Sequence, residues 1–497
     1  MDVVYSSRPL WAVLVSMIAA FLILATGEKN RNLRESWTII AGLAKFLIVF
    51  SMVPVIMQGK VIEYTLITFY PGLLLQFRID AFGMMFGLIA SSLWIATSFY
   101  SIGYVRALNE HAQTRYFFAF AMCLTSTIGI AFSANLLTFL VFYEMLTVAT
   151  YPLVIHKESR EAIIAGRKYF AYTLTAGCVL LFAIAMVYYQ AGTLDFKAGG
   201  FLAGSGSDGL LIFLFVLLIC GFGVKAGIMP LHEWLPTAMI APTPVSALLH
   251  AVAVVTAGVF GCLRVILYVF GPVLLHDLGI WLIMAYIISF TVVGAGFLAV
   301  GQDHLKRRLA FSTINNLAMI ILGAILLTRS SMTGGIIHMA NHAFMKITLF
   351  FCAGAIHVKA HKDYVSQLDG LGRQMPLTFG AFAIGAIGLS GIPPVNGFIS
   401  KWYLCLGTFE ANQIIFLLVF LTSSTLDIVF FFPVIYKGFF KKPLDDVTPH
   451  FDEAPMMMVI PLTITALLSI IFGIAPDAFV RFFSITTLAV QNILGIG

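Results

Sequence analysis

Apolar runs long enough to cross a membrane recur along almost the whole chain. A helix needs about 20 mainly apolar residues to cross the hydrocarbon core of a bilayer. Of the 497 residues, 60% are hydrophobic and only 10% are charged, which is far from the balance of a soluble domain. The sequence therefore predicts an all-α integral membrane protein, embedded in the lipid bilayer and without a nucleic-acid partner.

The apolar runs divide into about fourteen predicted transmembrane helices. They begin near Leu10, Trp37, Ile79, Tyr116, Leu136, Gly166, Gly209, Pro244, Leu278, Leu305, Gly335, Pro376, Gln413 and Met456. Alternating the loops between the two sides places eighteen of the 29 Lys and Arg residues on one side. Because cytoplasmic loops are enriched in Lys and Arg, we expect that side to be cytoplasmic and both termini to face outward.

No segment is predicted to form a soluble domain or to hold a cofactor. The six cysteines stand apart in apolar segments without a C-x-x-C spacing, so the pattern predicts no zinc site, iron–sulfur cluster or disulfide. We therefore expect the chain to use energy from an ion gradient or from a partner.

A few ionisable residues fall inside the predicted spans, where a charge costs several kcal/mol unless it is paired or hydrated. Each is a candidate functional residue for that reason. The candidates are Glu144, Lys225, His250, His338, His342, Lys346 and Lys401.

Three of these candidates share one helix face. His338, His342 and Lys346 follow an i, i+4, i+8 spacing, which predicts a polar stripe within an apolar span. The two histidines have the spacing of some zinc ligands, but a lysine follows and no carboxylate stands at the spacing of a metallopeptidase. No metal site is expected at this stripe.

Prolines accompany two of the candidate lysines. Pro230 and Pro236 follow Lys225, and the Pro393–Pro394 pair precedes Lys401. Because proline removes a backbone donor, two interpretations are open: kinked packing helices, or broken helices that line an ion path. Two such breaks in corresponding positions favour the second, as in inverted-repeat transporters.

The other charges within or beside the spans are given structural roles. Arg264 and Asp427 are expected to pair or to line water, and Lys45 to extend toward the membrane surface. Arg78 and Asp80 are placed at the membrane interface, where charge costs less.

Four stretches carry a resemblance to a known family. They are VKAGIMPLHEWLPTAMIAPTPVSALLHAVAVVTAGVF, DHLKRRLAFSTINNLAMIILG, HMANHAFMKITLFFCAGAI and LSGIPPVNGFISKWY, in that order. In content and spacing they resemble the antiporter-like subunits of respiratory complex I and of Mrp-type cation/proton antiporters. The resemblance covers roughly residues 75 to 440.

The resemblance implies a particular architecture. It implies fourteen helices with two inverted five-helix repeats, each with a half-channel, and broken seventh and twelfth helices. The chain then divides into an N-terminal three-helix segment (1–105), a first repeat (106–270), a second repeat (271–440) and a C-terminal helix (441–497).

The resemblance also implies a proton relay along the middle of the membrane. Glu144 matches the glutamate of the fifth helix and Lys225 the lysine of the broken seventh, as a coupled pair. His250 takes the eighth-helix position, and Lys401 matches the terminal lysine of the broken twelfth. The central relay of the eleventh helix corresponds to His342 and Lys346, which share a face with His338.

The implied function is proton translocation within a multisubunit complex of a prokaryotic inner or plasma membrane, with Na⁺ or K⁺ as further candidate ions. Since the sequence ends soon after its fourteenth span, it resembles the compact D-type member of Mrp Na⁺/H⁺ antiporters. Proton-pumping subunits of complex I, membrane-bound hydrogenases, formate hydrogenlyase and inorganic-carbon uptake complexes are the alternative. A scaffold whose charges have no transport role is a third interpretation, against which the complete charge set argues.

Overall fold

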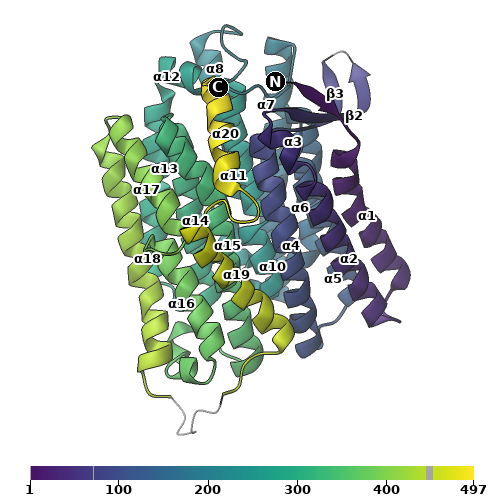
Figure 1. The fold of residues 1–497 in the computed structure, drawn as a ribbon, viewed down its shortest axis with the longest axis vertical. Helices are drawn as coiled ribbons and strands as arrows, with labels where there is room; N and C mark the ends of the chain where they lie inside the picture. Colours follow the sequence, from purple (N-terminus) through teal and green to yellow (C-terminus); the bar gives the residue numbers. More distant parts are fainter. Residues whose placement is uncertain (1, 71, 444–450, 497) are drawn as a thin grey trace.

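The computed structural model describes residues 2–70, 72–443 and 451–496, which form a bundle of long helices (Figure 1). Within these residues, thirteen helical segments are long and apolar enough to cross a membrane. Both termini lie at the same end of the bundle (Figure 1), as an even number of crossings requires. The prediction of a multi-pass all-α membrane protein is confirmed.

The N-terminal part combines helices with a small sheet. The helices are α1 (Arg8–Thr26), α2 (Arg31–Phe50), α3 (Val53–Met57) and α4 (Ala81–Ala107). Polar residues fix two of their starts, because the side chains of Asn30 and Asp80 accept hydrogen bonds from the backbone N–H groups of Leu33 and Gly83.

The strands were not predicted from the sequence, which assigned residues 60–78 to a loop. They are β1 (Val3–Tyr5), β2 (Val61–Tyr70) and β3 (Leu73–Ile79); β1 runs parallel to β2, and β2 antiparallel to β3. Glu63 stands opposite Arg78 across β2 and β3, and their side chains form an ion pair of 2.5 Å. The sheet lies at the end of the bundle that holds the termini (Figure 1).

The first half of the remaining chain contains an interrupted seventh and an interrupted eighth span. Its elements are α5 (Gln113–Ala131), α6 (Leu136–Val154), α7 (Arg160–Ala191), α8 (Asp208–Ala226), α9 (Trp234–Thr237), η1 (Ala238–Ile240), α10 (Thr243–Ala251), α11 (Val254–Arg264) and the π-helix η2 (Val265–Phe270). The break between α10 and α11 was not predicted.

The second half contains the broken twelfth span. Its elements are α12 (Pro272–Asp277), α13 (Ile280–Val300), α14 (Leu305–Ile325), α15 (Arg329–Ala360), η3 (Val365–Gln367), η4 (Leu371–Arg373), α16 (Pro376–Ser390), α17 (Gly397–Glu410) and α18 (Ile414–Phe440). The predicted span from Pro376 is divided between α16 and α17, on either side of Pro393–Pro394, so the predicted break is confirmed. The chain continues through α19 (Met456–Ile474) and α20 (Phe482–Leu494), which together lead back to the end that holds the N-terminus (Figure 1).

Protein surrounds the central helices of the bundle. The apolar windows of the segment Thr243–Phe270 and of α14 are buried along their whole length by other helices, whereas those of α1, α7 and α18 are 39% buried. The candidate histidines and lysines of α10, α15 and α17 therefore face protein and not lipid.

Candidate functional site

Helix interruptions place two of the candidate residues beside unwound backbone. Helix α8 ends one residue after Lys225, at Gly227, whose φ of +77° suits glycine. His250 is the second-last residue of α10, and the chain is non-helical at Val252 and Ala253 before α11 begins. Broken helices leave backbone groups free, which is how ion paths in membrane proteins obtain polar surfaces.

Glu144 lies at the contact between α6 and α7. Its carboxylate covers Gly177, where an added Cβ would overlap with Oε1. That oxygen is buried and has no hydrogen-bond partner among the described residues. Glu144 interacts electrostatically with Lys225, but the two side chains form no ion pair within 4.0 Å in this part of the structure.

Lys225 rests against the residue that precedes Glu144. Its Nζ donates a hydrogen bond of 2.6 Å to the backbone oxygen of Tyr143 and lies 3.4 Å from the centroid of the Tyr143 ring. The ammonium therefore has one occupied position on Tyr143 and a carboxylate close by on the same helix. Two alternative partners on adjacent residues are the requirement for a two-position gate.

The middle of the site contains two histidines with one bare nitrogen each. His250 Nδ1 and His342 Nε2 are buried and have no hydrogen-bond partner in the described part of the chain. The His250 ring packs 4.9 Å from the ring of Phe350, and both histidines interact electrostatically with Lys346. Neutral imidazoles with a free nitrogen can accept or pass on a proton.

His338 differs from these two because both of its nitrogens are engaged. Nδ1 lies 2.7 Å from the hydroxyl of Ser400, and Nε2 lies 3.2 Å from the amide oxygen of Asn316. The residue therefore joins α14, α15 and α17. Its ring centroid is 6.3 Å from that of His342, as the predicted stripe requires.

Lys346 and Lys401 share the far part of the site with a carboxylate. Lys346 Nζ donates to the Ser312 hydroxyl at 2.7 Å. Lys401 Nζ donates to Asp427 Oδ2 at 2.9 Å and to the Ser424 hydroxyl at 3.0 Å. Asp427 is fully buried, and its other oxygen has no partner among the described residues.

The seven candidates thus form two clusters. Glu144 and Lys225 make the first, with Tyr143; the second runs from His250 through the α15 stripe to Lys401 and Asp427. Within the described residues no hydrogen bond or ion pair joins Lys225 to His250. Gly258 of α11 packs against Lys225 and lies eight residues after His250, which corresponds to about 12 Å of helix.

Three assignments made from the sequence are wrong. Arg264 pairs with Asp80 through two hydrogen bonds of 2.5 and 2.8 Å, so it is not a partner of Asp427. Asp427 pairs with Lys401 in the site. Lys45 does not reach the membrane surface, because its Nζ is buried and bonded to the Ser16 hydroxyl and the Leu124 backbone oxygen.

Sequence reasoning missed several polar residues of the site. Ser312 and Asn316 belong to the run STINN inside a span, which was a visible signal. Asp427 stands alone among apolar residues, which was also visible, but its role depends on the lysine it meets. Tyr143 acts through its backbone oxygen and its ring, and the sequence carries no signal for that.

Comparison with known proteins gives the family of the fold and of these positions. The NADH:quinone oxidoreductase/Mrp antiporter transmembrane family matches residues 133–427. Hydrogenase-4 component B of Escherichia coli is 30% identical over 81% of this chain and 62% of its own length. A Na⁺/H⁺ antiporter subunit of Alkalihalophilus pseudofirmus is 29% identical over 94% of this chain and 61% of its own length.

The match spans less than two thirds of each of these relatives. Among solved structures, a chain of the Mrp complex from Dietzia sp. has the same fold, with a TM-score of 0.86 at 20% identity over 98% of this chain and 97% of that chain. All site residues from Glu144 to Asp427 fall inside the matched family segment.

Proposed function

This chain belongs to the NADH:quinone oxidoreductase/Mrp antiporter family of membrane subunits, and on that premise we propose that it translocates protons within a multisubunit complex. The observation that carries the proposal is a set of buried polar atoms without partners among the described residues. Glu144 Oε1, His250 Nδ1, His342 Nε2 and Asp427 Oδ1 are all of this kind. Buried polar atoms are normally hydrogen-bonded, and a path for water and protons explains why four bare atoms follow one row.

The first step of the proposed path is the exchange of Lys225 between two partners. Contact with the Glu144 carboxylate stabilises the ammonium form, whereas a dry site without that carboxylate favours release of the proton. The 2.6 Å bond to the Tyr143 oxygen holds the ammonium next to Glu144 without closing the ion pair. A small rotation of the Lys225 side chain then switches the lysine between holding and releasing a proton.

The second step crosses the gap between the two clusters. Water along the broken seventh and eighth spans carries the proton to His250, and His342 and Lys346 pass it on. Asp427 then accepts the role of partner to Lys401, from which the proton leaves. Moving one charge against 100 mV costs about 2.3 kcal/mol, which a change of one buried ion pair can supply.

Two kinds of complex are candidates for the host. The similarity to a Na⁺/H⁺ antiporter protein over 94% of the chain supports a Mrp-type monovalent cation/proton antiporter, with this chain in a role like that of the compact D-type member. The similarity to hydrogenase-4 component B supports a redox-driven complex instead, in which the chain is a proton-pumping part of an oxidoreductase. Both place the chain among other membrane subunits.

The sidedness of the proposed path follows from the loop charges. We place the Lys- and Arg-rich end in the cytoplasm and both termini on the outer face of a prokaryotic inner membrane. The division into two half-channels, residues 106–270 and 271–440, assigns the Glu144–Lys225 cluster to the first and the Lys401–Asp427 pair to the second.

Ion flux in vesicles that contain the whole complex tests this function. We expect Glu144→Gln and Lys225→Met each to abolish proton movement under an imposed gradient while the complex stays assembled. Arg329→Gln is a suitable control, because it removes a charge at the start of α15 away from the row. Flux that survives both substitutions would mean that the buried charges are structural.

The partners decide between the two hosts. Flavin, iron–sulfur or nickel subunits that purify with the chain indicate the redox machine, and a complex of membrane subunits that exchanges Na⁺ for protons without a redox substrate indicates the antiporter.

A further inference from the structure

Two connecting loops bring three metal-ligand side chains together at the end of the bundle opposite the termini. Glu110 and His111 lie between α4 and α5, and His156 lies between α6 and α7. One ligand atom from each lies within 4.8 Å of the others. The two imidazoles stack with a centroid distance of 4.9 Å, and His156 Nε2 is 3.7 Å from Glu110 Oε2.

His156 has no role that its protein neighbours explain. Its side chain is buried, and neither ring nitrogen has a hydrogen-bond partner among the described residues. The ring packs against Tyr116, at 5.3 Å between centroids. Burial lowers the pKa of His156 to about 4, so the imidazole is neutral at neutral pH, which is the form that binds metals.

The charges around the cluster are already arranged for a cation. Arg115 is paired with Glu158 and donates to the backbone oxygen of His156 at 3.2 Å, so its guanidinium is engaged. Glu158 Oε1 lies 3.8 Å from His111 Nε2, which brings a second carboxylate within reach.

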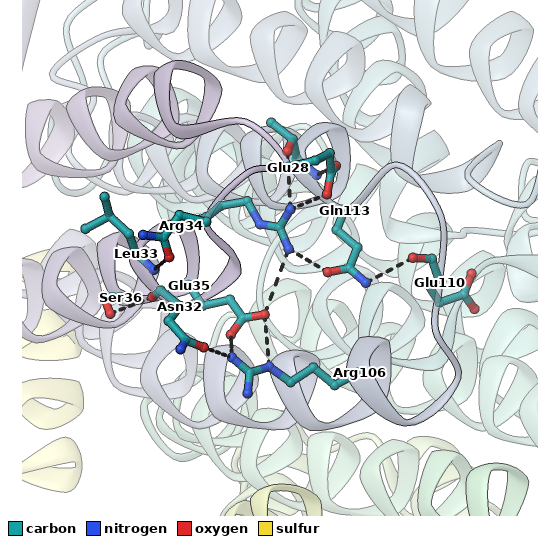
Figure 2. A network of polar contacts seen from close by, with 11 residues as sticks. Glu28, Asn32, Leu33, Arg34, Glu35, Ser36, Arg106, Glu110 and Gln113 are labelled. Carbon is teal, nitrogen blue, oxygen red and sulfur yellow. Dashed lines mark hydrogen bonds and ion pairs between the residues drawn. The ribbon is translucent and has the colours of Figure 1, made fainter.

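A separate polar network holds the first loop in place (Figure 2). Arg34 bonds to Glu28 and Gln113, each at 2.5 Å, and Gln113 in turn donates to the backbone oxygen of Glu110 at 3.0 Å. Figure 2 shows the Glu110 carboxylate directed away from this network. The network therefore fixes the backbone of Glu110 and leaves its side chain available.

We propose that Glu110, His111 and His156 bind a divalent transition-metal ion of the Zn²⁺ class, with Glu158 or water as the fourth ligand. Two imidazoles and a carboxylate suit Zn²⁺ and its neighbours, whereas Ca²⁺ and Mg²⁺ prefer oxygen ligands only. With bonds of about 2.0 to 2.1 Å, the ligand atoms of a tetrahedral site lie about 3.3 Å apart. The half-exposed His111 and the Glu110 side chain need to move by about an ångström to reach that geometry.

A metal at this site would tie the end of α6 to the loop before α5. His156 follows Glu144 by twelve residues along the same helix and its end, or about 18 Å. The bound ion would restrain the helix that carries the proposed gate, without touching the row of buried charges.

Zn²⁺ binding to the purified full-length chain in detergent tests the proposal, by competition with a chromophoric chelator and with Co²⁺ absorption as a report of tetrahedral geometry. We expect His111→Ala, Glu110→Gln and His156→Gln each to weaken binding by a factor of at least about ten. The matched control is His276→Ala, because His276 is also exposed and lies 3.9 Å from a carboxylate, that of Asp277, and we expect no change.

The His111→Ala variant is decisive if the His156 variant does not fold, because the His111 side chain is 48% exposed. Wild-type protein that fails to bind Zn²⁺, or that binds it as tightly as His111→Ala and Glu110→Gln do, would overturn the proposal.

Discussion

Removal of one partner of the Lys401–Asp427 pair should cost more stability than removal of both. The charged atoms are 2.9 Å apart, and the side chains are 7% and 0% exposed. At an effective dielectric constant of about 20 their attraction is about 6 kcal/mol, and most of it offsets the cost of burying the two charges. Asp427→Asn leaves the lysine charged and unpaired, so we expect a loss of about 3–5 kcal/mol.

The double variant Lys401→Met/Asp427→Leu removes both charges and keeps the volume similar. We expect it to be close to wild type in stability, since hydrophobic replacements of buried pairs are often neutral. Thermal unfolding of the purified chain in detergent measures this part, and proton flux of the whole complex measures the function. We expect both variants to block flux.

Two results would refute this reasoning. An Asp427→Asn protein as stable as wild type would mean that water already compensates the lysine. A double variant that is stable and still moves protons would mean that the pair is a structural contact.

Three further predictions follow from contacts elsewhere. Gly177→Ala should reduce flux at least about tenfold, because the new Cβ would overlap with the Glu144 carboxylate, whereas Gly380→Ala, in open space, should not; equal flux in both would contradict this. Lys45→Ala should lower the melting temperature by creating a cavity, and Lys45→Met should lower it much less, which thermal unfolding in detergent checks. Zn²⁺ at about 100 times its Kd should stabilise the folded chain by about 2.7 kcal/mol, and a melting temperature that rises equally in His111→Ala would argue against the metal site.

The spans were predictable because the bilayer imposes one length on each of them. The predicted start near Pro376 even coincides with the first residue of α16, and the Pro393–Pro394 pair marks the break before α17. The break after His250 was not predictable in the same way, since Val252 and Ala253 are ordinary helix residues.

The candidate residues could be found individually, but their partners could not. A lone charge in an apolar run is visible in the sequence, as Lys225 and Lys401 are. Which atom compensates it depends on helix packing: Arg264 meets Asp80 across 184 residues. The bond from Lys225 goes to a backbone oxygen, which no side-chain pattern reveals.

The sheet was missed for a different reason. The run Val61–Tyr70 is rich in β-branched and aromatic residues, which is typical of a strand. Between two spans it was taken as a loop, because attention to apolar length gives no weight to short segments outside the membrane.

Proton flux in a Lys346→Met variant of the assembled complex tests the central claim most directly, with Lys45→Met as its control. Both lysines are fully buried, but Lys346 lies in the row of bare polar atoms and Lys45 lies against α1 and α5. We expect Lys346→Met to stop proton movement and Lys45→Met to leave it intact. Equal flux in the two variants would contradict the account of a proton path through α15.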